Sequence, residues 1–170
     1  MIILSVLCEA LLYVCFSILI GCFFLNLLPD SIKPEIAVPK WIVLATVSGV
    51  ALFSFMPVLK IVLYLYQDLG LGLTLRSVLL NFEVGKAWIT TGVLSIILLI
   101  FLSPIKLEQN RLFSVVGMIL MLSLVGALGW SSHARSLSRW PGFFTYSSHF
   151  LAITLWIGIL FNVSWFSKNH

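Results

Sequence analysis

The chain has 170 residues, of which 61% are hydrophobic and only 9% are charged. A soluble domain carries roughly 25% charged residues and cannot bury this much apolar surface, so the composition excludes a soluble globular protein and predicts an integral membrane protein. The formal net charge of +4 suits loops beside anionic lipid and gives no reason to expect a nucleic-acid partner.

Apolar runs long enough to cross a bilayer, which takes about 20 helical residues, recur along the chain. They cover residues 2–28, 41–66, 87–105, 112–132 and 143–166. Lipid accepts only helices or closed barrels, and none of these runs alternates with the period of a strand. We therefore predict an all-α fold, a polytopic membrane helical bundle of five transmembrane helices. The whole chain, residues 1–170, then forms one membrane domain.

The first run carries three cysteines, Cys8, Cys15 and Cys22, at intervals of seven residues. This spacing puts them on one helical stripe with successive sulfurs roughly 10 Å apart along the axis, too far to share one metal ion. We interpret the stripe as a packing seam of small residues. Glu9 interrupts the same run, and its short side chain cannot reach far toward water. It is a candidate metal ligand, or a compensating charge beside a bound cation.

Lys60 lies near the end of the second run, and snorkelling toward water near Gln67 and Asp68 accounts for it. The stretch 69–83 that follows is apolar but too short and too charged to span a bilayer. We predict an interfacial helix there.

Met118 and Met121 are three residues apart in the fourth run, about one helical turn. Thioether sulfur favours Cu(I), so the two side chains could form a deeper metal station, some 18 Å from the end of the run. The alternative is that both methionines fill a packed core.

Two histidines lie on either side of the last connection: His133 at the end of the fourth run and His149 near the start of the fifth. The connection is short, which predicts antiparallel neighbouring helices with both imidazoles toward one membrane face. Trp130 and Trp156 would shape the pocket, and Gly158 would permit close helix approach. An imidazole near hydrocarbon is costly without a partner, which favours a shared ligand set. The alternative is interfacial anchoring by His and Trp side chains.

Imidazole binds copper, zinc and haem iron, so the histidines alone do not identify the metal that is bound. Two histidines on adjacent antiparallel helices can also hold a b-type haem, and a haem-binding electron-transfer subunit is the alternative function. The sequence has no phosphate loop, nucleophile elbow, HExxH motif or paired-cysteine zinc pattern. We therefore expect a binding or transport protein and not an enzyme.

Four stretches resemble the membrane domain of the copper resistance D (CopD) family, which includes bacterial copper-import proteins. Residues 9–21 are similar to the first span of that family, and residues 48–57 to its second. Ser132-His133-Ala134 stands where the family usually shows Gly-His-Ala. Residues 149–158, in which the histidine is followed seven residues later by Trp and then by Gly, look like its most recognisable segment.

The resemblance implies copper import, or copper homeostasis and resistance, at the bacterial plasma membrane with the N-terminus outside. His133 and His149 would bind copper near the outer face, with Met118, Met121 and Glu9 as further candidate ligands. The implied partners are the copper ion, the lipid bilayer and a periplasmic copper-binding protein. Family domains typically continue for further spans, so a homo-oligomer or a second membrane subunit is also expected.

Overall fold

The computed structural model describes residues 2–29, 31–103, 111–132 and 137–167. Within these ranges the elements are α1 (Ile2–Leu27), α2 (Lys40–Phe53), α3 (Met56–Leu69), α4 (Leu71–Asn81), α5 (Glu83–Leu102), α6 (Arg111–Trp130) and α8 (Arg139–Phe166). The prediction of an all-α membrane helical bundle is confirmed.

Segments that are apolar and long enough to cross a membrane account for most of this bundle. In the described ranges they are Ile3–Leu27, Lys40–Gln67, Glu83–Leu102 and Arg139–Phe166, and Ser114–Trp130 is a shorter apolar helix. The chain is thus a multi-pass membrane protein.

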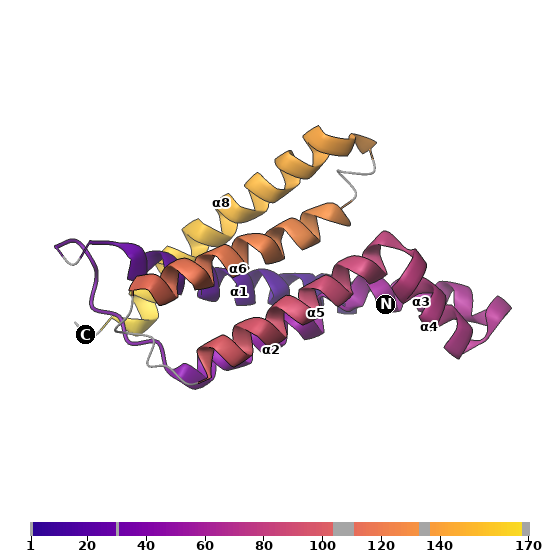
Figure 1. Cartoon of the computed structure of the whole chain (residues 1–170), viewed down its shortest axis with the longest axis horizontal. Coiled ribbons are helices and arrows are strands. Elements are labelled where there is room, and N and C mark those ends of the chain that lie inside the picture. The colour runs from indigo at the N-terminus through magenta and orange to yellow at the C-terminus, as the bar shows by residue number, and fades with distance from the viewer. Residues whose placement is uncertain (1, 30, 104–110, 133–136, 168–170) are drawn as a thin grey trace.

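α1 occupies the middle of the bundle and packs against α8, α2 and α6 (Figure 1). α5 packs against α6 and α2, while α4 packs against α3 and α5. We call the end of the bundle where α1 begins the N-terminal end. α6 ends there and α8 starts there, as Figure 1 shows. The opposite end is called the far end.

The core is built around four fully buried side chains of α1: Phe16, Leu19, Ile20 and Phe23. The other helices contribute the fully buried Val43, Val47, Val50, Leu98, Leu102, Met121, Leu124 and Phe150. Many other large apolar side chains are exposed on the outside of the bundle, as expected where lipid is the solvent. Association in lipid depends on close packing and interhelical hydrogen bonds, so the fit between helices decides their positions.

α1 and α8 cross where two glycines meet. A Cβ atom added to Gly158 would meet the Ser17 carbonyl oxygen, and one added to Gly21 would lie 2.5 Å from the Gly158 carbonyl oxygen. The buried Asn162 amide, one turn beyond, donates to the carbonyls of Ile18 at 3.1 Å and Gly158 at 2.8 Å. The expectation that Gly158 permits close helix approach is confirmed.

The far end of the bundle is tied together by backbone contacts. Ile36 and Ser167 form an isolated antiparallel bridge, and the Ala37 amide donates to the Phe166 carbonyl at 2.9 Å. Lys40 Nζ also donates to the Ser103 carbonyl, which joins the start of α2 to the end of α5. The end of α8 is therefore fixed to the segment that precedes α2.

The second apolar run is not one continuous helix, because α2 ends at Phe53 and α3 begins at Met56. Pro57 is the cause: it has no N–H for the Phe53 carbonyl, and its ring would clash with that carbonyl in a straight helix. The break changes the bonding of nearby carbonyls as well. The Ala51 carbonyl accepts hydrogen bonds from Ser54 Oγ at 3.1 Å and from Trp88 Nε1 of α5 at 3.0 Å.

Replacing Trp88 by phenylalanine should lower the free energy of unfolding by about 1 kcal/mol, because the indole hydrogen bond to the break is lost while most ring packing is kept. Thermal unfolding in detergent measures the change. Trp156→Phe is the matched control, since that side chain is 70% exposed. Equal stability of the two variants would show that the bond contributes nothing.

α4 occupies most of the segment predicted to be interfacial and has 11 residues. Gly70 separates it from α3 with a φ of +75°, a conformation that favours glycine. Val78 of α4 packs on Val58 and Val62 of α3 in a small second core. The position of α4 relative to the bilayer surface stays a prediction.

Candidate functional site: a polar cavity at the N-terminal end

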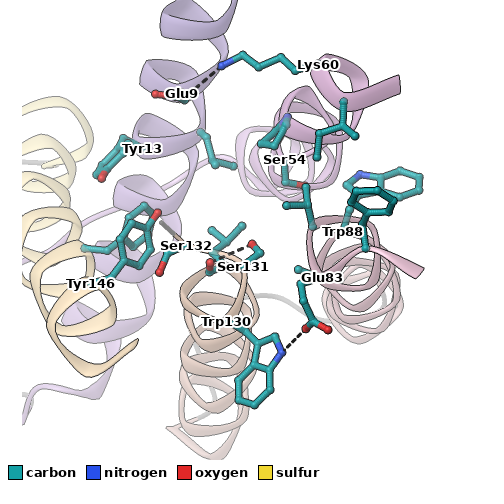
Figure 2. Close-up of a pocket in the computed structure, with 18 of the residues that line it drawn as sticks. Glu9, Tyr13, Ser54, Lys60, Glu83, Trp88, Trp130, Ser131, Ser132 and Tyr146 are labelled. Atoms are coloured by element: carbon teal, nitrogen blue, oxygen red, sulfur yellow. Dashed lines mark hydrogen bonds and ion pairs between the residues drawn. The ribbon is translucent and has the colours of Figure 1, made fainter. Parts of the chain in front are cut away.

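A cavity of about 940 Å³ lies between α1, α3, α5, α6 and α8 (Figure 2). Most of its wall is apolar. Its charged and hydroxyl-bearing lining residues are Glu9, Tyr13, Ser54, Lys60, Glu83, Ser131, Ser132, Arg139 and Tyr146. These side chains come from α1, α3, α5 and α8, from the break between α2 and α3, and from the segment that follows α6, so the site exists only when the bundle is folded.

Glu9 and Lys60 form an ion pair between α1 and α3 at the cavity, with Nζ 3.8 Å from Oε1. Ser5 Oγ, one turn before Glu9, donates to the same Oε1 at 3.3 Å. Figure 2 shows the pair between the two helices. Lys60 therefore has a carboxylate partner in addition to the access to water that the sequence indicates.

A second carboxylate, Glu83, lies at the first residue of α5. Its Oε2 accepts a hydrogen bond from Trp130 Nε1 of α6 at 2.8 Å, and its Oε1 lies 3.5 Å from Lys86 Nζ. The helix N-terminus also favours negative charge at this position. Glu83 thus joins α5 to the end of α6 beside the cavity.

Aromatic rings form the wall between α1 and α8. Phe150 is almost fully buried, and its ring centroid lies 4.6 Å from that of Tyr13 and 5.0 Å from that of Phe16. Tyr146, one turn earlier on α8, stacks on Phe150 at 6.0 Å. The hydroxyl groups of Tyr13 and Tyr146 bring oxygen atoms to an otherwise apolar wall.

Neither histidine is seen to line this cavity in the part of the chain that the structure describes. His133 lies outside the described residues; Ser132, which immediately precedes it in the sequence, lines the cavity. His149 is on the exposed side of α8 and does not line the cavity, although its neighbour Phe150 does. The convergence of the two imidazoles stays a prediction.

The other sequence candidates also separate into lining and non-lining residues. Glu9 and Trp130 line the cavity, whereas Trp156 points outward from α8 with 70% exposure. Met121 is fully buried in the main core and Met118 packs against it, so neither lines the cavity.

The cysteine stripe of α1 lies in the packing of the helix. Cys15 and Cys22 are buried, Cys8 is half-buried, and all three are free thiols. Cys15 Sγ of α1 lies 2.7 Å from the position that a Cβ atom on Gly49 of α2 would occupy. α1 and α2 are therefore in close contact at this point. This packing agrees with the interpretation of the stripe as a seam.

The donor chemistry of the cavity is that of oxygen. Carboxylates and hydroxyl groups line it, and no group of three or more His, Cys, Asp or Glu side chains in the described ranges could hold a metal ion. Oxygen donors fit Cu(II) better than the softer Cu(I).

Sequence reasoning missed the partners of the charged residues. Lys60 and Glu9 are separated by 51 positions, and Glu83 and Trp130 by 47. One local signal was available: Tyr13 follows Glu9 by one helical turn, which puts a hydroxyl group on the same side of α1 as the carboxylate.

Comparison with known families gives one match over most of the chain. Residues 1–143 match the family model described as "Copper resistance protein D-like, N-terminal domain". No curated protein and no solved structure matches the chain.

Proposed function

Since the chain belongs to the copper resistance protein D-like family, we propose that it binds copper at the N-terminal end of the bundle and serves copper import or homeostasis. His133 and His149 are the proposed ligands, and Glu9 is the proposed carboxylate ligand from the cavity. In this proposal copper is the cargo of the protein and the protein carries out no catalysis. Met118 and Met121 are candidates for a deeper station.

The observation that carries the proposal is the position of Glu9. It lines the same cavity as Ser132, which precedes His133, and as Tyr146 and Phe150, which flank His149 on α8. Glu9 can act together with the histidines only if it lies at the same end of the bundle, and its place in this cavity supports the proposal. A charged ion near hydrocarbon needs ligands that replace its hydration shell, and this end of the bundle has polar atoms for that purpose.

The proposed location is the bacterial plasma membrane with the N-terminus outside. α1 begins at the cavity end, so this orientation would open the cavity to the side from which imported copper arrives. A periplasmic copper-binding protein would then be the natural donor. A second membrane subunit or a second copy of this chain is a further proposed partner.

Copper titration of the purified protein in detergent tests the proposal. We expect His133→Ala and His149→Ala each to weaken Cu(II) binding about tenfold or more, the factor that corresponds to losing about 1.4 kcal/mol of ligand binding. His170→Ala is the matched control, because it removes the third histidine of the chain and should leave the affinity unchanged.

Two results would contradict the proposal. The first is wild-type protein that retains no copper under copper-replete conditions. The second is unaltered affinity in both variants, which would remove the histidines as ligands. A Soret band in the visible spectrum after haem-replete expression would identify the electron-transfer alternative instead.

A further inference from the structure

We propose that Lys60 is a built-in counter-ion that competes with incoming copper for the Glu9 carboxylate, so that metal entry exchanges an ammonium group for a metal ion. This inference rests on the proposed function and describes its regulation. Four features of the pair support it: its geometry, its weakness, its position and its charge balance.

The geometry leaves half of the carboxylate available. Lys60 Nζ and Ser5 Oγ both contact Oε1 of Glu9. Among the described residues, no hydrogen bond or ion pair reaches Oε2. An incoming cation can therefore approach Oε2 before Lys60 leaves, and the exchange needs no state in which the carboxylate is bare.

The pair is long and partly exposed, so it contributes little to holding α1 and α3 together. Its N–O distance is 3.8 Å, and the Lys60 and Glu9 side chains are 44% and 60% exposed. Ion pairs with this exposure contribute little to folding, because solvent screens them and ordering two side chains costs entropy. The long flexible stem of lysine lets the ammonium group withdraw toward water without moving α3.

The pair lies where an incoming metal ion would meet it. Both side chains line the cavity, Glu9 from α1 and Lys60 from α3. α1 packs mainly on α8, α2 and α6, while α3 packs mainly on α4, so the ion pair is a separate link between two parts of the bundle. Loss of this link would leave the core around α1 in place.

The charge balance explains why a lysine would be kept there. A carboxylate close to hydrocarbon is costly unless water or a positive charge compensates it. Lys60 provides that charge when no metal is bound, and the metal provides it afterwards. Return of the ammonium group to Glu9 would then favour release, which transport requires as much as binding.

Cu(II) titration of the full chain in detergent, with three variants, tests the exchange. Lys60→Gln should bind Cu(II) about fivefold more tightly than wild type, the factor expected when one unit charge about 4 Å away is removed at the dielectric constant of water. Glu9→Gln should bind more weakly than wild type. Lys86→Gln is the matched control, because Lys86 is also half-exposed and paired with a glutamate at 3.5 Å, but does not line the cavity.

A second measurement does not depend on affinity. Amine-selective modification of the intact protein, quantified by mass spectrometry, should be slow at Lys60 in metal-free protein and several-fold faster with Cu(II) bound. The rate at Lys86 should not change. In Glu9→Gln protein, Lys60 should react quickly with or without the metal.

The outcomes separate this inference from the proposed function. Wild-type protein that binds no copper contradicts both. Copper binding in wild type, with Lys60→Gln equal to or weaker than wild type, overturns the exchange alone. Equal gains in Lys60→Gln and Lys86→Gln would also overturn it, because the effect would then come from net charge. A Lys60 modification rate that copper leaves unchanged has the same consequence.

Discussion

Gly158→Val is expected to prevent α1 and α8 from packing and to lower the free energy of unfolding by about 3 kcal/mol, at the upper end of the usual cost of overpacking. The added Cβ would meet the Ser17 carbonyl oxygen and would lie 3.0 Å from the Gly21 amide nitrogen. Both obstacles are backbone atoms, so the helices must separate. Separation would also break the Asn162 hydrogen bond to Ile18. Thermal unfolding in detergent, followed by circular dichroism, measures the loss.

Gly92 and Gly126 provide matched controls for this substitution. Both are helical glycines with nothing within 4 Å of an added Cβ. Valine at either position should change stability by less than about 1 kcal/mol, through helix propensity alone. If Gly158→Val changed the free energy of unfolding as little as these controls, the close crossing of α1 and α8 would be contradicted.

Gly85→Val is expected to give the second large effect, a detachment of α4 from α5. Its Cβ would meet the Val78 carbonyl oxygen and lie 2.6 Å from Leu79 Cα, again backbone atoms. The expected cost is about 2 to 3 kcal/mol. Because Phe82, Glu83 and Val84 all line the cavity, copper affinity should fall together with stability.

Limited proteolysis in detergent locates this change, since cleavage should increase at Gly70 and across α4 while α1 and α8 stay protected. Gly72→Val is the control within α4, because an added Cβ there meets nothing within 4 Å. Proteolysis equal to wild type in Gly85→Val would show that α4 does not depend on this contact.

The sequence could predict the helical fold because the apolar runs are long and lipid admits few alternatives. It could also predict that Gly158 marks a close approach, since small residues in membrane helices have few other uses. The partner glycine, Gly21, was not predictable. Which residue of α1 faces Gly158 depends on the relative height and rotation of two helices far apart in the sequence.

The break between α2 and α3 shows a different limit. Pro57 is visible in the sequence, yet prolines are tolerated in membrane helices when other groups satisfy the freed carbonyls. Those groups are Ser54 and Trp88, and the second lies 37 positions from the Ala51 carbonyl that it contacts. Hydropathy alone therefore gave one run where the structure has two helices.

The candidate site was predictable only in part for the same reason. Glu9 was identified because a carboxylate in an apolar run is conspicuous. Its partner Lys60 had a sufficient local explanation in snorkelling, and nothing local pointed to α1. Contacts across the cavity follow from the tertiary arrangement, which neither composition nor periodicity encodes.

The attachment of α8 is unequal along its length. Near its C-terminus it is held by the Gly158 crossing, by Asn162 and by the bridge from Ser167 to Ile36. Near its start it borders the cavity with Tyr146 and Phe150, and the rings of Trp140 and Phe143 pack against Trp130 of α6. The crossing near the C-terminus joins backbone to backbone, whereas the contacts near the start join side chains. Because side chains change rotamer far faster than packed helices shift, a change in cavity width would come from the start of α8 and not from the crossing.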